Sequence, residues 1–213
     1  MNALLLRYRF RLLFAGTVLL IIVLAFPHPP WLLERSALLL FVLVGVNTLR
    51  HRGILLAAAI AFGVLSLLLA FLDDITSLPP FLNRGLALIS FYGILLLALF
   101  HRVTQERPVT TELLYGLCAL YLQLGLAFAI AYELLEIFWP GSFTGSAGSP
   151  LHLDSFVYFS LVTLSTVGYG DIQAVKPIAR LLAISEAVIG VLFIALAVAR
   201  GMSLLSDADE EDV

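Results

Sequence analysis

The sequence predicts an all-α membrane protein with six transmembrane helices, plus one short re-entrant helix that leads into a loop. Three observations support this fold class. The chain has 213 residues and is 61% hydrophobic but only 13% charged, about half the charged fraction of a soluble domain. Its apolar residues form long blocks of about the length that crosses a bilayer. A polar segment with two glycines, TLSTVGYGD (residues 163–171), interrupts the last apolar region.

Six apolar blocks are expected to span the membrane. The first follows several arginines and is similar to a signal peptide. No small-x-small cleavage site follows it, so a retained anchor is expected. The single cysteine, Cys118, lies in an apolar run and is expected to be buried. The expected spans are residues 11–26, 31–49, 53–72, 81–101, 111–139 and 177–205.

The basic residues predict the orientation of the spans. Eight lie at one set of span ends and four at the other, and the richer side is expected to be cytoplasmic. Both termini are then cytoplasmic, in a plasma membrane, and the segment 139–176 lies outside. The first set is Arg7, Arg9, Arg11, Arg50, Arg52, Arg102, Arg107 and Arg200, and the second is Arg35, Arg84, Lys176 and Arg180.

The outer segment is expected to contain more than a loop. Residues 139–150 are rich in Gly, Ser and Pro and predict an irregular turret. Asp154 or Ser155 is expected to cap a short apolar helix, residues 155–165, which cannot cross a bilayer. The chain must then return through TVGYGD. Irregular backbone at membrane depth is tolerated only where protein buries it or where it lines a water-filled path.

The TVGYGD segment is suited to holding a dehydrated cation with backbone oxygens. Successive carbonyls can point the same way if the backbone handedness alternates, and Gly168 and Gly170 adopt positive φ at little cost. Val167 and Tyr169 are expected to point away and pack against the short helix. The hydroxyl of Thr166 adds an oxygen at the inner end. The C-terminal dipole of the short helix also favours a cation.

These letters resemble the selectivity filter of potassium channels. The resemblance covers about residues 110–205 and includes LSTVGYGDIQAVKPIARLLAISEAVIG, which is similar to the pore of bacterial members. YELLEIFWPGSF is similar to the outer end of the preceding helix. The resemblance implies a pore domain, residues 111–205, with outer helix, pore helix, filter and inner helix. Because one subunit supplies one filter strand, a tetrameric channel is expected.

The resemblance also assigns roles around the filter. It implies K⁺ ions held by Thr166, Val167, Gly168 and Tyr169, with Gly170 shaping the outer mouth. Asp171 is expected behind the filter, hydrogen-bonded to Tyr158 on the pore helix. Some family members carry a pore-helix Glu that pairs with this acid, and Val162 stands there in this chain. Inactivation behaviour that depends on such a pair is therefore in doubt.

The inner helix contains the expected gate. Gly190 occupies the place of the family's gating glycine, but close packing between helices would explain it equally well. Spacing and resemblance place four apolar side chains along the cavity, where they could gate by dewetting, although core packing would require the same residue types. These side chains are Val191, Ile194, Val198 and Met202.

Two acids are expected inside membrane helices, where an ionised carboxylate is costly. Glu186 has three open roles: an ion pair with Arg180, a contact with the pore-helix backbone, or a protonated state. A structural hydrogen-bonding role is favoured over proton sensing. The same alternatives apply to Glu133.

The four helices before the pore are similar to a voltage-sensor scaffold without its charges. The fourth span has only Arg84 near its outer end, where a sensor needs several arginines at every third position. Arg84 is expected to be an interfacial residue that faces Asp73 or Asp74. The predicted divisions are a sensor-like domain at 1–101, a linker at 102–110, the pore domain, and a disordered acidic tail at 206–213.

The predicted function is passive, potassium-selective conduction by a homotetramer with little or no voltage sensing. A nonselective cation channel and a nonconducting regulatory subunit are the alternatives. An enzyme or carrier is not favoured, because the sequence has no P-loop, HExxH, nucleophile elbow or inverted repeat. The expected partners are K⁺, membrane lipid and other copies of the chain, with no nucleic acid and no cofactor beyond the K⁺ ions.

Overall fold

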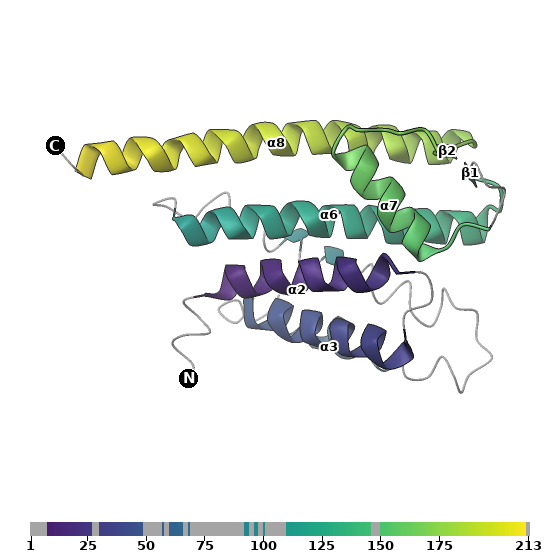
Figure 1. The fold of residues 1–213 in the computed structure, drawn as a ribbon, viewed down its shortest axis with the longest axis horizontal. Helices are drawn as coiled ribbons and strands as arrows, with labels where there is room; N and C mark the ends of the chain where they lie inside the picture. The colour runs from purple at the N-terminus through teal and green to yellow at the C-terminus, as the bar shows by residue number, and fades with distance from the viewer. Residues whose placement is uncertain are drawn as a thin grey trace.

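The computed structural model describes residues 8–26, 30–48, 57, 60–65, 68, 92–93, 96–97, 100, 110–145 and 150–211. The long helices in this part of the chain lie roughly side by side, and one short helix crosses them obliquely (Figure 1). The elements are, in order, α2 (Arg9–Leu24), α3 (Trp31–Thr48), α6 (Thr111–Phe138), β1 (Phe143–Gly145), α7 (Leu153–Leu164), β2 (Ile172–Ala174) and α8 (Pro177–Glu211).

Four of the six predicted spans coincide with helices, namely α2, α3, α6 and α8. Within the described residues, two helical stretches are long and apolar enough to cross a bilayer, Thr111–Phe138 and Pro177–Met202. The predicted spans at 53–72 and 81–101 lie largely outside the described residues, as do Arg84 and most of the linker.

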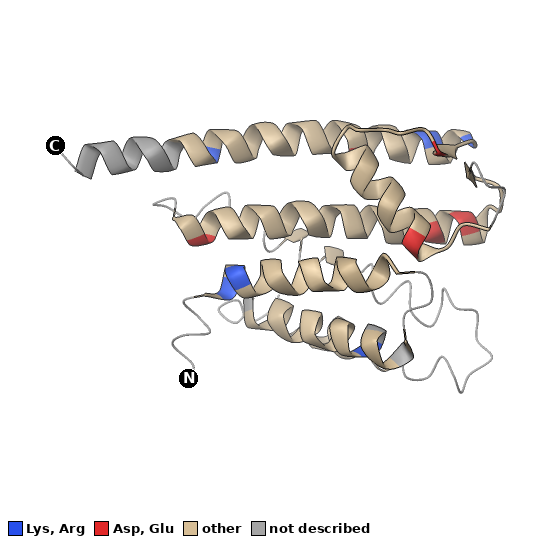
Figure 2. Cartoon of the chain, viewed as in Figure 1, with Lys and Arg blue, Asp and Glu red and all other residues tan. Residues whose placement is uncertain are grey.

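The directions of the helices place the described residues nearest the two chain ends at the same end of the molecule. The first residues of α2 and α6 and the last residues of α8 lie at the same end of the molecule, and β1 and β2 lie at the opposite end (Figure 1). Along α2, α3 and α6, the Lys, Arg, Asp and Glu residues lie toward the helix ends, and the middles of these helices consist of other residue types (Figure 2). This distribution is typical of helices that cross a hydrocarbon layer.

The region from α6 to the end of α8 differs from the sequence prediction in three details. The short helix α7 begins at Leu153, so His152 occupies the N-cap position and Asp154 lies in the first turn. The turret is not wholly irregular, because β1 pairs antiparallel with β2, with Thr144 opposite Gln173. The acidic end was expected to be disordered, but α8 continues as a helix to Glu211.

Helix α2 packs against helix α6. The ring of Phe10 faces Gly116, where an added Cβ would lie 3.1 Å from the ring. The buried amide of Gln123 donates to the hydroxyl of Thr17 over 3.2 Å. Near the start of both helices, Arg11 of α2 forms an ion pair with Glu112 of α6. Both apolar packing and polar bonds therefore join α2 to α6.

Helix α8 leaves most of its apolar surface uncovered in a single chain. Ile184, Val188 and Leu192 are 60%, 53% and 64% exposed, respectively. A surface of this kind requires an apolar neighbour, either lipid or another protein chain. Cys118 of α6 is likewise exposed, contrary to the prediction of a buried thiol.

Candidate functional site

The TVGYGD loop joins α7 to β2 with a backbone of alternating handedness. Gly168 and Gly170 have φ values of +56° and +80°, as the sequence predicted, and Thr166 has a φ of +62°. Left-handed backbone is unfavourable for a β-branched residue. Left-handed backbone was therefore not predicted at Thr166, although its position two residues before Gly168 continues the same alternation. The loop adopts the conformation that turns carbonyls in one direction.

The hydrogen bonds of the loop show where two of these carbonyls point. The amides of Val167 and Gly168 both donate to the carbonyl of Val162 on α7, over 3.0 and 3.3 Å. In a trans peptide, a carbonyl points opposite to the amide of the next residue. The carbonyls of Thr166 and Val167 therefore point away from α7. Successive oxygens on one open side of a strand can replace the hydration shell of a cation.

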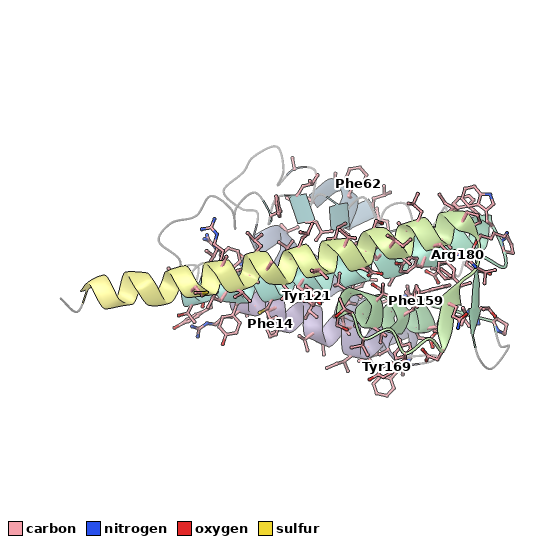
Figure 3. All side chains as sticks on the ribbon, turned by 90° about the horizontal axis from the view of Figure 1, so that it is seen from above. Phe14, Phe62, Tyr121, Phe159, Tyr169 and Arg180 are labelled. Carbon is pink, nitrogen blue, oxygen red and sulfur yellow. The ribbon has the colours of Figure 1, made fainter. Side chains whose placement is uncertain are left out.

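Two tyrosines and an acid frame the outer part of the loop. The rings of Tyr169 and Tyr158 stack, with centroids 6.5 Å apart and planes 3° from parallel. The side chains of Tyr158 and Asp171 lie close enough to interact, in line with the pairing expected for them. Tyr169 projects outward from the helices (Figure 3) and is 72% exposed. The side chain of Val167 is 53% exposed as well, so α7 of the same chain covers neither loop side chain completely.

The segment after the loop is held by the turret. The side-chain amide of Gln173 donates to the carbonyl of Gly170 over 3.0 Å. The ammonium group of Lys176 donates to the carbonyl of Pro140 over 2.9 Å. Arg180 donates to the carbonyl of Ala174 over 3.2 Å. The Gln173 bond joins β2 to the end of the loop, and the Arg180 bond joins α8 to β2. The Lys176 bond joins this segment to the residues that follow α6.

The C-terminal end of α7 is held between α6 and α8. The hydroxyl of Tyr121 on α6 donates to the carbonyl of Leu164 over 3.0 Å. The same carbonyl sits against Gly190 of α8, where an added Cβ would lie 2.3 Å from the oxygen. The structure thus gives Gly190 a close-packing role, and helix α8 runs through this position. A hinge at Gly190 stays a prediction.

Replacing Tyr121 by Phe is expected to loosen this end of α7. The change removes the bond to Leu164, with a loss of about 1 kcal/mol of stability. Thermal unfolding in detergent should report a midpoint lower by roughly 2–4 °C. The control is Tyr115→Phe, which removes a hydroxyl near the start of the same helix and keeps the ring that faces Arg11. Equal midpoints for the two variants would contradict the assigned role of Tyr121.

The four predicted cavity residues lie on an open face of α8. Val191, Ile194, Val198 and Met202 are 54%, 44%, 56% and 66% exposed. Their exposure agrees with a lining role. Ile194 and Val198 also border an apolar groove of about 680 Å³ between α6 and α8.

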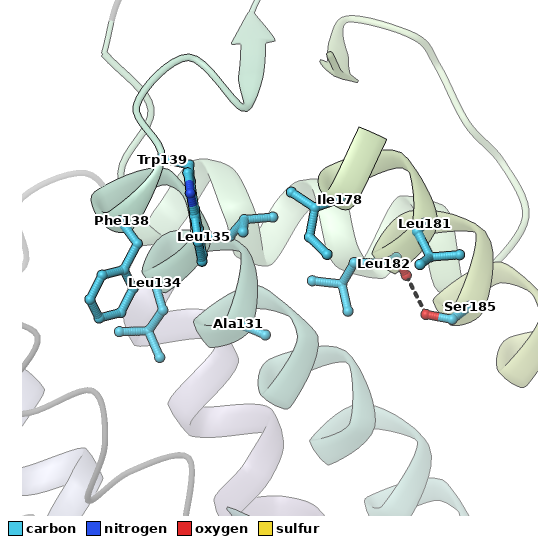
Figure 4. A pocket seen from close by; sticks show the side chains of 9 residues that line it. All are labelled: Ala131, Leu134, Leu135, Phe138, Trp139, Ile178, Leu181, Leu182 and Ser185. Atoms are coloured by element: carbon cyan, nitrogen blue, oxygen red, sulfur yellow. Dashed lines mark hydrogen bonds between the residues drawn. The ribbon is translucent and has the colours of Figure 1, made fainter. Parts of the chain in front are cut away.

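A second groove, of about 540 Å³, lies between the outer ends of α6 and α8 (Figure 4). Its polar side-chain groups are the indole N–H of Trp139 and the hydroxyl of Ser185, which donates to the carbonyl of Leu182 within its own helix over 2.7 Å. The described residues contain no group of His, Cys, Asp or Glu side chains that could hold a metal ion. The groove is lined by Ala131, Leu134, Leu135, Phe138, Trp139, Ile178, Leu181, Leu182 and Ser185.

The geometry of helix, short helix, carbonyl-bearing loop and helix defines a candidate pore. Comparison with known proteins agrees, because residues 117–207 match the family model described as "Ion channel". Protein LctB of Bacillus caldotenax is 33% identical over 104 residues, which are 46% of this chain and 77% of that protein. The chain therefore belongs to the ion channel family. The matched residues run from α6 through α7 and the TVGYGD loop into α8.

Two further relatives match part of the chain. The two pore potassium channel c of Oryza sativa subsp. japonica is 38% identical over 90 residues, which are 42% of this chain and 18% of that protein. The inward rectifier potassium channel Kirbac3.1 of Paramagnetospirillum magnetotacticum is 36% identical over 99 residues, which are 45% of this chain and 29% of that protein. The chain thus spans less than a third of the length of these two relatives. No solved structure matches the chain.

Proposed function

We propose that this protein is a potassium-selective channel that conducts K⁺ passively through a homotetramer. The observation that carries the proposal is the loop backbone. Positive φ at Thr166, Gly168 and Gly170 alternates with the residues between them, and the carbonyls of Thr166 and Val167 point away from α7. Two relatives that match part of the chain are named as potassium channels, which supports K⁺ as the transported ion.

The exposed surfaces of the single chain support a tetramer. One chain provides one strand of oxygens, which cannot surround an ion. Tyr169 and the apolar face of α8 are uncovered in the single chain, and neighbouring copies would cover them. Four loops around one axis would place the carbonyls of Thr166, Val167, Gly168 and Tyr169 on the ion path, with Gly170 at the outer mouth.

Weak or absent voltage sensing completes the proposal. The predicted fourth span contains one arginine. Moving one charge across the whole field contributes about 2.3 kcal/mol per 100 mV, and an outer arginine would cross only part of it. Both termini would lie in the cytoplasm of a cell with this channel in its plasma membrane, with the TVGYGD loop near the outer face.

Planar-bilayer recording of the purified protein tests the proposal. Under a K⁺/Na⁺ gradient, we expect a reversal potential near the K⁺ equilibrium value and an open probability that is flat in voltage. A reversal potential midway between the two ions would favour a nonselective cation channel. The absence of current across a wide voltage range would favour a nonconducting regulatory subunit. A steep voltage dependence would contradict the absence of a sensor.

A further inference from the structure

A buried carboxyl connects the three helices around the candidate pore. Glu186 of α8 accepts a hydrogen bond from the hydroxyl of Tyr132 of α6, over 2.5 Å to its Oε2 atom. The hydroxyl of Ser160 of α7 contacts Oε1 of the same carboxyl, and it also lies 2.6 Å from the carbonyl of Gly125 of α6. We call these four residues the carboxyl cluster. The side chains of Glu186, Tyr132 and Ser160 are fully buried.

The number of protons in the cluster depends on the state of Glu186. Ser160 has one hydroxyl proton but lies at bonding distance from two oxygens, those of Gly125 and Glu186. An ionised carboxylate and a carbonyl are both acceptors only. With Glu186 ionised, one of these two contacts would bring two oxygens together with no proton between them. The cluster is therefore one proton short if Glu186 is charged.

A protonated Glu186 satisfies every contact. Tyr132 donates to Oε2 of Glu186, Oε1–H of Glu186 donates to Ser160, and Ser160 donates to the carbonyl of Gly125. Each of the three oxygen–oxygen contacts then contains one proton. Buried polar networks are stable when all their members are satisfied.

The surroundings provide no counter-charge for an ionised Glu186. The guanidinium of Arg180, an expected partner, instead donates to the backbone of Ala174, which corrects that alternative. In the described part of the chain, the titratable groups that face Glu186 are the hydroxyls of Tyr132 and Tyr121 on α6, and α7 contributes only Ser160. An unpaired buried carboxylate would be strongly unfavourable there.

The surrounding rings also hold the hydroxyl of Tyr132 in place. Its ring packs edge-on against Phe143 and Phe159, with centroids 5.2 and 5.1 Å apart, respectively. The donor to Glu186 therefore comes from a packed aromatic group of α6. Phe159 belongs to α7 (Figure 3), so the same packing orients the short helix.

We propose that Glu186 is a neutral carboxylic acid that donates to Ser160 and positions α7 between α6 and α8. Ser160 lies one turn before Leu164, the last residue of α7, and the loop follows directly. A displacement of Ser160 would therefore move the start of the loop. Glu186 is in this sense a positioning residue for the candidate filter, and this role rests on the proposed function. The protonation state of Glu186 does not rest on it.

Infrared spectroscopy of the purified protein at neutral pH tests the protonation state. The difference spectrum between the wild type and Glu186→Gln should contain the carbonyl band of a protonated carboxylic acid. Ser160→Ala should shift this band, because the acid loses its acceptor. The control Ser185→Ala removes a hydroxyl that bonds only within α8, and it should leave the band in place. A carboxylate band in the difference spectrum instead would overturn the proposal.

Ion-selectivity measurements on two variants test the positioning role. Glutamine reproduces the neutral acid, with an amide donor for Ser160 and a carbonyl acceptor for Tyr132, so Glu186→Gln should keep the K⁺/Na⁺ permeability ratio within about twofold. Glu186→Leu leaves Tyr132 without an acceptor, and the ratio should fall by about fivefold or more, as expected for losing one buried hydrogen bond. Equal losses in both variants would overturn the positioning role. Such losses would mean that the channel needs the negative charge of Glu186, which both substitutions remove.

The outcomes separate this inference from the proposed function. If the wild-type protein conducts without selectivity or does not conduct, the proposed function fails, and the infrared band still decides the state of Glu186. If the wild type is selective and Glu186→Leu matches it with the same thermal stability, the positioning role fails and the proposed function stands.

Discussion

Gly168→Ala is expected to abolish selective K⁺ conduction while leaving expression and assembly intact. Gly168 has a φ of +56°, and no atom within 4 Å would contact an added Cβ. The effect is therefore conformational and not steric. A left-handed alanine costs about 1–2 kcal/mol, and the backbone can relieve this cost by rotating the carbonyls of the loop. We expect K⁺ flux into liposomes to fall at least about tenfold.

Gly141 provides a matched control for this prediction. It lies in the turret after α6, has a φ of +79°, and also has no atom within 4 Å of an added Cβ. Gly141→Ala therefore introduces a similar backbone cost away from the loop. We expect nearly wild-type K⁺ flux from this variant. Unchanged flux in Gly168→Ala, or an equal loss in both variants, would contradict the assignment of the loop as the filter.

Gly190→Ala is expected to destabilise the contact between α7 and α8. The new Cβ would lie 2.3 Å from the carbonyl oxygen of Leu164, and this neighbour is backbone. Relieving the overlap requires the two helices to separate, at a cost of about 1–3 kcal/mol for each chain. The thermal midpoint in detergent should fall by roughly 4–10 °C. Loss of K⁺ flux should accompany the change, because Leu164 directly precedes the loop.

Gly201 lies on the same helix and has no atom within 4 Å of an added Cβ. Gly201→Ala should leave the thermal midpoint unchanged or raise it slightly, since alanine favours a helix by about 1 kcal/mol over glycine. This comparison separates packing from hinge bending at Gly190. A Gly190→Ala protein with the wild-type midpoint but altered gating would favour a hinge and contradict the packing role.

Local features were predictable from the sequence where backbone chemistry alone decides them. Gly168 and Gly170 were expected in the left-handed region and are found there, because glycine has no Cβ to oppose positive φ. The short helix was expected at 155–165 and extends over Leu153–Leu164, because its apolar run ends in polar residues. Membership of the ion channel family also followed from TVGYGD and its flanking helices.

Features that depend on distant partners could not be predicted. Glu186 had three open roles, and its partners Tyr132 and Ser160 lie 54 and 26 residues away along the chain. Positive φ is unfavourable for the β-branched side chain of Thr166. This conformation occurs where the amides of the next two residues donate hydrogen bonds to α7. The pairing of β1 with β2 likewise joins short segments that show no strand pattern by themselves.

The class of the protein follows from its residues alone, because long apolar blocks are best satisfied in a membrane. The position of the candidate ion site follows from them too, because alternating glycines allow carbonyls to align. How that site is held in place depends on contacts between helices. The carbonyl of Leu164 fits against Gly190 and accepts from Tyr121, and the carboxyl of Glu186 joins α6, α7 and α8. Such contacts arise from the close approach of helices far apart in the chain, and no local pattern of residues specifies which partners will meet.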